Sequence, residues 1–248
     1  MLPSSGGQAV ARELPRVEES DPTAVALGYV HDGSQIAEAI RLHTKSKKKE
    51  ARDRAIHIME RVGISDASRR YSAYPHEMSG GLRQRAMIAM SLACDPKLII
   101  ADEPTTALDV TVQAQVLHLL KEVTHETGAA LVIITHDLGV VARYADRVNV
   151  MYAGRIVEAG PAREIYNNPK HPYTVGLMNS VPRLDGDLDS ALEPIEGQPP
   201  DLADLPSGCA FQPRCGHAIE RCSVERPRLT TLENEHAAAC WVEINVAL

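Results

Sequence analysis

Two short apolar runs on either side of one amphipathic helix constrain the fold of this chain most strongly. The runs cover 98–101 (LIIA) and 130–135 (ALVIIT), and neither alternates with polar residues, which predicts strands buried on both faces. Between them, apolar residues recur at helical spacing until Gly128, a residue type that commonly ends a helix. A strand, a helix and a strand in so short a span predict a parallel βαβ unit with a right-handed crossover.

Helical spacing also precedes this unit, and a hairpin is expected after it. One helical face is predicted upstream, formed by Ala51, Ala55, Ile58, Met59 and Val62. Residues 79–94 have the same spacing. Further along, the Ala153-Gly154 pair is expected to join two short strands, 148–152 and 155–158.

Changes in composition divide the chain into four segments. Residues 1–33 stay unassigned and are expected to be poorly ordered, because they show no hydrophobic period. A helical segment is expected at 34–96, an α/β core at 97–160 and a cysteine-containing C-terminal extension at 161–248. The predicted fold class is therefore α/β.

The composition disfavours several classes of protein. The 26 Lys and Arg are outnumbered by 33 Asp and Glu, and aromatic residues make up 4%, so neither phosphate neutralisation nor base stacking on nucleic acid is expected. No apolar run approaches the roughly 20 residues that span a bilayer, and the N-terminus has no apolar signal core. We therefore expect a cytoplasmic protein that meets a membrane only through a partner.

Two acidic residues directly follow the first apolar run. Asp102 and Glu103 stand at the carboxyl end of a parallel strand, which is the edge where open α/β sheets bind ligands. Asp102 is placed to hold Mg²⁺, directly or through water, and Glu103 to take a proton from an attacking water. Taken alone, such a pair can equally face solvent or cap a helix.

Three further motifs accompany this pair. Ser79, Gly80 and Gly81 open a helix and offer a hydroxyl and bare backbone amides to a phosphate, although a capping serine with two flexible glycines explains them as well. The segment 106–109 (TALD) follows the acids. His136 ends the second apolar run, where it can reach the same sheet edge or have a purely structural role.

In this order and spacing, the four elements resemble the ATPases of ABC transporters. MSGGLRQR (78–85) is similar to the family's signature motif, LIIADE (98–103) to Walker B, TALD to the D-loop, and His136 to the switch histidine. The resemblance implies a partial ABC-type nucleotide-binding domain with ATP and Mg²⁺ as cofactors. It implies that Asp102 assists Mg²⁺, that Glu103 is the general base and that His136 senses the γ-phosphate.

The same resemblance implies roles that are shared between two subunits. Ser79, Gly80 and Gly81 would close over ATP held by a second ATPase subunit, in a homo- or heterodimer, and Asp109 would couple the two sites. HPYTVGLMNSVP (171–182) is typical of the peptide and nickel branch of importers. From Gln35 to Cys240 the chain thus resembles the ATP-binding subunit of oligopeptide and dipeptide importers.

That family implies a function and a set of partners. The subunit would hydrolyse ATP to energise peptide import, docked on permease subunits at the inner face of the cell membrane. An extracytoplasmic peptide-binding protein would be an indirect partner, and no nucleic acid is expected. The resemblance leaves the choice among oligopeptide, dipeptide and nickel cargo open.

One expected motif is absent from the sequence. A phosphate-binding loop ends in Gly-Lys-Ser/Thr, and these 248 residues hold no Gly-Lys pair. We expect the resemblance to stop near Gly33 and the chain to be N-terminally incomplete, by truncation or frameshift. Little ATP affinity and no turnover are predicted for this chain alone. The alternative function is a catalytically incomplete interaction protein that lends its signature motif to a partner.

The cysteines form a separate feature near the C-terminus. Four of the five lie there, at positions Cys209, Cys215, Cys222 and Cys240. In a cytoplasmic chain such a cluster suggests a metal or iron–sulfur site before disulfides, although reduced cysteines in a loop-rich tail are the alternative. The spacing is wider than the usual structural zinc pattern. The resemblance favours a [4Fe–4S] cluster over zinc, with His217 and His236 as alternative ligands.

Overall fold

The computed structural model describes residues 31–106, 108–180 and 194–244. Nearly all of the segment predicted to be poorly ordered, 1–33, lies outside the described residues. The chain divides into two compact units, Met1–His136 and Asp137–Leu248. This division does not test the segment boundaries drawn from the sequence, which stay predictions.

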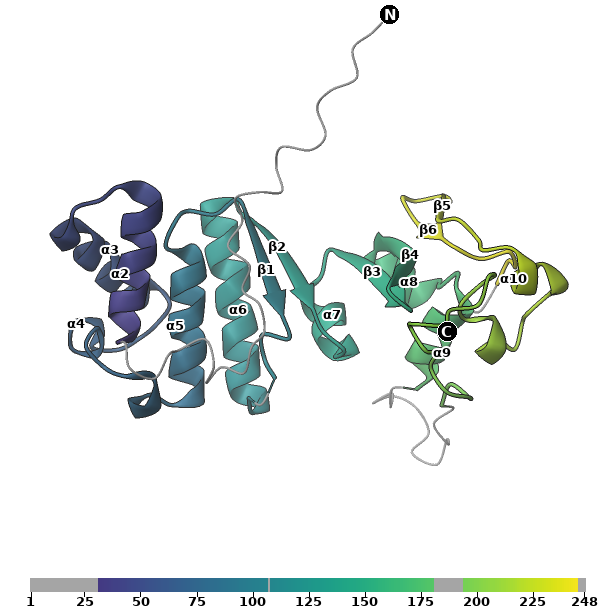
Figure 1. Ribbon diagram of the computed structural model, residues 1–248, viewed down its shortest axis with the longest axis horizontal. Coiled ribbons are helices and arrows are strands. Elements are labelled where there is room, and N and C mark those ends of the chain that lie inside the picture. Colours follow the sequence, from purple (N-terminus) through teal and green to yellow (C-terminus); the bar gives the residue numbers. More distant parts are fainter. Residues whose placement is uncertain (1–30, 107, 181–193, 245–248) are drawn as a thin grey trace, which may run out of the picture. The chain divides into compact units, whose positions relative to one another are not determined.

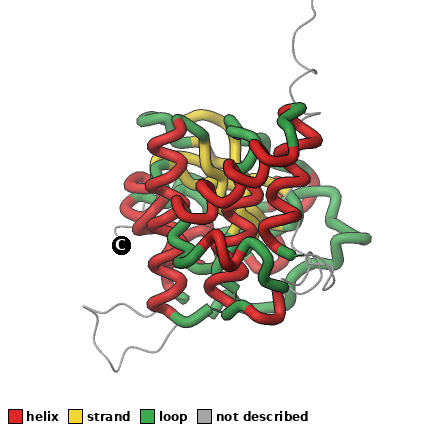
Figure 2. The backbone as a smooth tube through the Cα atoms, turned by 90° about the vertical axis from the view of Figure 1, so that its left-hand side faces the viewer, coloured by secondary structure: helices red, strands yellow, loops and turns green. Residues whose placement is uncertain are grey.

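The first unit begins with a group of helices. These are α2 (Asp32–Thr44), α3 (Lys48–Arg61), the short α4 (Ala67–Arg70), the 3₁₀ turn η1 (Pro75–Glu77) and α5 (Gly80–Leu92). The longer helices α2, α3 and α5 pack against one another (Figure 1), and Figure 2 views them from their outer side. The predicted face of α3 is the buried one, since Ala51, Ala55 and Met59 are fully buried.

The predicted βαβ unit follows these helices. It consists of β1 (Leu98–Asp102), α6 (Val110–Thr127) and β2 (Ala130–Ile134). The two strands pair in parallel, with Leu98 opposite Ala130 and Asp102 opposite Ile134. As the sequence predicts, α6 ends at Gly128, whose φ of 68° is the left-handed conformation that favours glycine.

One face of this two-stranded sheet is covered and the other is open. Ile99 and Ala101 point into the core that Val116 of α6 shares with them. On the opposite face, the side chains of Val132 and Ile134 remain 45% and 47% exposed. The prediction that these strands are buried on both faces is therefore wrong for the described residues, because the helices of this unit cover one face only.

The second unit is built around an antiparallel sheet. Its elements are α7 (Leu138–Tyr144), β3 (Arg147–Tyr152), β4 (Arg155–Pro161), α8 (Ala162–Asn167), α9 (Pro172–Asn179), η2 (Gln212–Arg214), α10 (Glu220–Val224), β5 (Thr230–Thr231) and β6 (Ala237–Ala238). The strand order is β3-β4-β6-β5. The predicted hairpin between β3 and β4 is confirmed, because Ala153 and Gly154 both have the positive φ that a two-residue turn needs.

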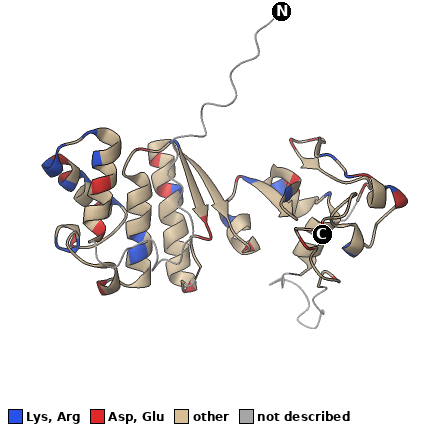
Figure 3. Cartoon of the chain, viewed as in Figure 1, with Lys and Arg blue, Asp and Glu red and all other residues tan. Residues whose placement is uncertain are grey.

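Charged residues of both signs are spread along the helices of the first unit (Figure 3). Arg54 pairs with Asp95 at 2.6 Å, and Arg61 pairs with Glu126 at 3.0 Å. Exposed pairs of this kind contribute about 0–1 kcal/mol each, so the buried helix faces dominate the stability of the unit. Across the described ranges, no helix is long and apolar enough to cross a membrane.

Two positions on α2 test this packing. Ile40 is fully buried, whereas Leu42 is 74% exposed. We expect Ile40→Ala to lower the free energy of unfolding by about 2–5 kcal/mol, because it leaves a cavity in the core. The matched change Leu42→Ala should alter it by less than about 0.5 kcal/mol. Denaturant unfolding followed by circular dichroism measures both, and equal losses would contradict the described orientation of α2.

Candidate functional site at the carboxyl edge of the parallel strands

The carboxyl ends of β1 and β2 bring three of the predicted site residues to one edge. Asp102 is the last residue of β1, and the backbone N–H of Glu103 donates to the carbonyl of Ile134 at 2.8 Å, which extends the pairing by one residue. His136 follows two residues after β2, and its Nδ1–H donates to Oε1 of Glu103 at 2.6 Å. The structure thus places Glu103 and His136 in direct contact, while their chemical roles stay predictions.

The carboxylate of Glu103 is fixed on two sides. Its second oxygen, Oε2, accepts a hydrogen bond from the hydroxyl of Thr106 at 3.1 Å. The backbone of Glu103 has a φ of 45°, a left-handed conformation that is uncommon for a residue with a side chain. The side chain of Glu103 is 25% exposed, and that of its partner His136 is 84% exposed. Glu103, with a fixed carboxylate beside the exposed imidazole of His136, is suited to accept a proton from a bound water.

The start of α5 forms a second part of the candidate site. Ser79 caps this helix, and its hydroxyl accepts a hydrogen bond from the N–H of Leu82 at 3.4 Å. Ser79 and Gly80 are exposed. A Cβ at Gly81 would lie 3.0 Å from Cγ1 of Val112, so the glycine lets the starts of α5 and α6 approach closely. Exposed amides at the positive end of a helix can bind an anion, while the capping explanation of Ser79 also holds.

Asp109 lies at the start of α6. Its Oδ1 accepts a hydrogen bond from the N–H of Val112 at 3.0 Å, which makes Asp109 the N-cap of the helix. Because Val112 is also the residue that approaches Gly81, the two helix starts lie side by side. The neighbouring Ala107 falls outside the described residues. Nothing in this geometry tests the predicted role of Asp109 in coupling two subunits.

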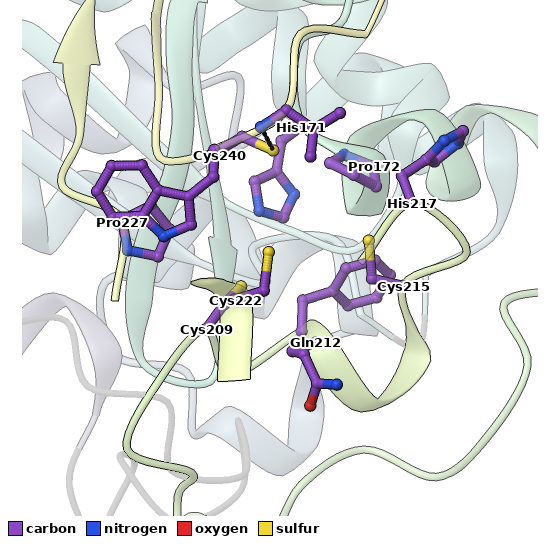
Figure 4. Close-up of a pocket in the computed structure, with 12 residues that line it drawn as sticks. His171, Pro172, Cys209, Gln212, Cys215, His217, Cys222, Pro227 and Cys240 are labelled. Carbon is purple, nitrogen blue, oxygen red and sulfur yellow. Dashed lines mark hydrogen bonds between the residues drawn. The ribbon is translucent and has the colours of Figure 1, made fainter. Parts of the chain in front are cut away.

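The four C-terminal cysteines converge on one pocket of the second unit (Figure 4). The pocket is lined by Cys209, Cys215, Cys222 and Cys240, together with His171, Phe211 and Trp241 among others. The N–H of Cys209 donates to the carbonyl of Cys222 at 2.8 Å, and all four cysteines are free thiols. In the described part of the chain, however, no three Cys, His, Asp or Glu side chains already stand at metal-binding geometry, so the side-chain positions themselves indicate no metal cluster.

Burial and mutual proximity both affect the pKa values of these thiols. Burial raises the pKa of Cys209, Cys215 and Cys240 above its ordinary value, and neighbouring cysteines of the group raise it further. For Cys240, the neighbours are Cys209 and Cys222. Without a cation to stabilise thiolates, these three groups are therefore protonated at neutral pH.

A buried carboxylate ties the surroundings of the pocket together. Glu158 on β4 is fully buried, and its Oε1 accepts hydrogen bonds from the backbone N–H of Lys170 at 2.6 Å and from Nε2–H of His236 at 2.7 Å. Its Oε2 accepts the backbone N–H of His171 at 3.0 Å. One side chain thus joins β4, the start of α9 and the segment before β6.

This arrangement bears on the alternative ligands expected from the sequence. The Nε2 of His236 is engaged by Glu158, which disfavours His236 as a metal ligand. His217 lines the pocket but is exposed. The sequence analysis missed Glu158, because a single acidic residue at an inward position of β4 is the only sign of its role. It also assigned no individual role to His171 or to Thr106.

The chain matches two protein families in different regions. Residues 4–106 match the ABC transporter family, and residues 157–222 match the family described as "Oligopeptide/dipeptide transporter, C-terminal region". The first match begins well before Gln35. The expectation that the resemblance stops near Gly33 is therefore wrong, since it continues to residue 4.

Curated relatives agree with both family matches. The chain is 46% identical to the oligopeptide transport ATP-binding protein OppD of Haemophilus influenzae, over 97% of this chain and 74% of that protein. It is 49% identical to OppD of Salmonella typhimurium, over 92% of this chain and 68% of that protein. It is 53% identical to a Brucella melitensis protein named for peptide import and ATP binding, over 86% of this chain, but it spans only 65% of that protein's length.

A solved structure supports the ABC ATPase type of α/β fold. The cbiO1 protein of Clostridium perfringens, part of the ABC transporter complex cbiONQ, is 30% identical, with a TM-score of 0.52. The aligned region covers 59% of this chain and 56% of that chain. These matches favour an ATPase subunit over the interaction-protein alternative, and the absence of a phosphate-binding loop stays a prediction. The chain belongs to the family of ATP-binding subunits of oligopeptide ABC importers.

Proposed function

We propose that this chain hydrolyses ATP to energise peptide import, as one of two ATPase subunits docked on permease subunits at the inner face of the cell membrane. The observation that carries the proposal is the contact of Glu103 with His136 at the carboxyl edge of the parallel strands. The family matches support it, because relatives across most of the chain are named for oligopeptide transport. An extracytoplasmic peptide-binding protein would deliver the cargo to the permease.

The residues at this edge suit phosphoryl transfer to water. Mg-ATP, when bound, supplies the phosphoryl group and a cation that offsets its charge. Asp102 offers carboxylate oxygens at the end of β1, the ligand type that Mg²⁺ prefers. Glu103 takes the proton of the attacking water. His136 contacts that carboxylate through Nδ1, and its side chain, which is 84% exposed, would also contact the γ-phosphate.

In this proposal, the start of α5 does not bind the ATP at the carboxyl edge of its own chain, but the ATP of the second ATPase subunit. Ser79, Gly80 and Gly81 lie exposed or half-exposed at the beginning of a 13-residue helix, with its positive end directed outward. We place them against ATP held by the second ATPase subunit. Asp109 caps the adjacent helix α6 and would move together with the start of α5. We therefore propose that it couples the two ATP sites of the dimer.

The proposal requires an assembly rather than an isolated chain. The described residues provide the acidic edge and the helix start, but the 248 residues contain no Gly-Lys pair to hold the β- and γ-phosphates. We therefore retain the prediction that the chain alone has little ATP affinity and does not turn over. Turnover is assigned to the transporter that forms with the second ATPase subunit and the permease.

Replacing Glu103 tests this assignment. In the assembled transporter, we expect Glu103→Gln to lower ATP turnover by about 10²–10⁴-fold, because the amide cannot take the proton from water. Phosphate release from membranes that hold the complex measures the effect. Glu126→Gln is the matched control, since Glu126 belongs to an exposed pair with Arg61, and turnover should stay unchanged. Undiminished turnover in Glu103→Gln would contradict the proposed base.

We also propose that the four-cysteine pocket holds a thiolate-bound cofactor, a [4Fe–4S] cluster rather than zinc. In support of this, four thiols from distant parts of the extension line one pocket, as Figure 4 shows, and four thiolates are the usual ligand set of such a cluster. Binding would require the side chains to rotate, since the thiols of the described residues do not stand at metal-binding geometry. The cofactor would also stabilise the thiolates of groups whose pKa burial raises.

The metal content of the full chain tests this second proposal. Chain purified without oxygen should contain iron and acid-labile sulfide, and Cys222→Ser should lose most of both. The matched control is Cys94→Ser, because Cys94 belongs to the first unit and is not among the residues that line the pocket. Iron, zinc and sulfide analysis measures the outcome. Zinc without sulfide would reject the cluster in favour of zinc, and no metal in the wild-type chain would reject the site.

A further inference from the structure

His171 is held rigidly beside the four thiols. Its side chain is 1% exposed, and its imidazole lines the cysteine pocket (Figure 4). Its backbone N–H is bound by Glu158 at 3.0 Å, and its ring packs against Phe211 with the centroids 5.8 Å apart. The position of this ring is therefore set by the protein, before any ligand enters the pocket.

The hydrogen bond at Nδ1 fixes the tautomer of His171. The backbone N–H of Tyr173 donates to Nδ1 at 3.1 Å, so Nδ1 presents a lone pair and carries no proton. A neutral imidazole without a proton on Nδ1 must carry it on Nε2. His171 therefore brings one N–H donor to the pocket.

The same tautomer disfavours His171 as a metal ligand. A metal ion on Nε2 would displace the proton to Nδ1, and Nδ1 would then face the N–H of Tyr173 with no acceptor between them. The groups that share the pocket with Nε2–H include the sulfurs of Cys209, Cys215, Cys222 and Cys240. A thiolate sulfur accepts hydrogen bonds, and such bonds tune metal–thiolate sites.

We propose that His171 is the hydrogen-bond donor to the thiolates of the four-cysteine site, a positioning residue that stabilises bound metal without ligating it. This inference rests on the proposed cysteine site. It explains the His171-Pro172-Tyr173 motif in structural terms. The N–H of Tyr173 sets the tautomer of the His171 ring, and Glu158 holds the backbone N–H of His171. The predicted outcome is a site whose affinity and electronic spectrum depend on a residue outside the cysteine segment.

Cobalt(II) binding to the full, reduced chain tests the inference, because thiolate-to-cobalt absorption reports the sulfur ligands directly. We expect His171→Leu to weaken cobalt affinity by about 10–100-fold, the usual cost of losing a partner outside the ligand set. The absorption should move to longer wavelength, because a thiolate without the hydrogen bond gives up electron density more easily. His171→Gln keeps an N–H donor and should restore both properties in part.

A check of folding and a control variant separate the possible outcomes. Circular dichroism checks the fold of each variant, and if His171→Leu does not fold, the spectrum of His171→Gln decides. His57→Ala removes an exposed imidazole of α3 that does not line the pocket, and it should change neither the cobalt affinity nor the spectrum. Wild-type affinity and spectrum in folded His171→Leu, or loss of the band in folded His171→Gln, would each overturn the inference. A wild-type chain with neither bound metal after purification nor thiolate-to-cobalt absorption would instead reject the cysteine site itself, and the inference with it.

Discussion

The parallel register of β1 and β2 decides where this chain can carry out chemistry. Asp102 lies opposite Ile134, the last residue of β2. The backbone N–H of Glu103 donates to the carbonyl of Ile134, and this hydrogen bond places Glu103 close to His136, two residues further along the chain. A shift of one residue would turn every side chain of a strand to its other face, and Asp102 would then point into the core. The register is held by burial of Ile99 and Ala101 against α6, so an apolar core positions the proposed catalytic pair.

The second unit depends on a different constraint. A fully buried carboxylate must be neutralised or surrounded by donors, and Glu158 is met by two backbone N–H groups and by His236. This requirement ties β4 to the C-terminal segment, because Glu158 and His236 lie 78 residues apart in the sequence. The cysteine pocket inherits its shape from that tie, since His171 is both a partner of Glu158 and a wall of the pocket.

Local signals account for most of what the sequence could predict. Gly128 ends α6, Ala153-Gly154 forms the tight turn, and Ser79 caps the start of α5. Features that depend on distant segments could not be predicted. The open face of β2 looks like a buried strand in sequence, because its apolar run does not alternate. The convergence of the thiols and the task of His171 likewise depend on chain pairing that no local spacing encodes.

Association between ATPase subunits tests the central claim of this account most directly. The measurement is analytical ultracentrifugation of the Glu103→Gln chain with the second ATPase subunit that copurifies with it. We predict that Mg-ATP drives association, because nucleotide on one subunit is bound by the Ser79–Gly81 helix start of the other. The same association with and without Mg-ATP would contradict a nucleotide site shared between subunits.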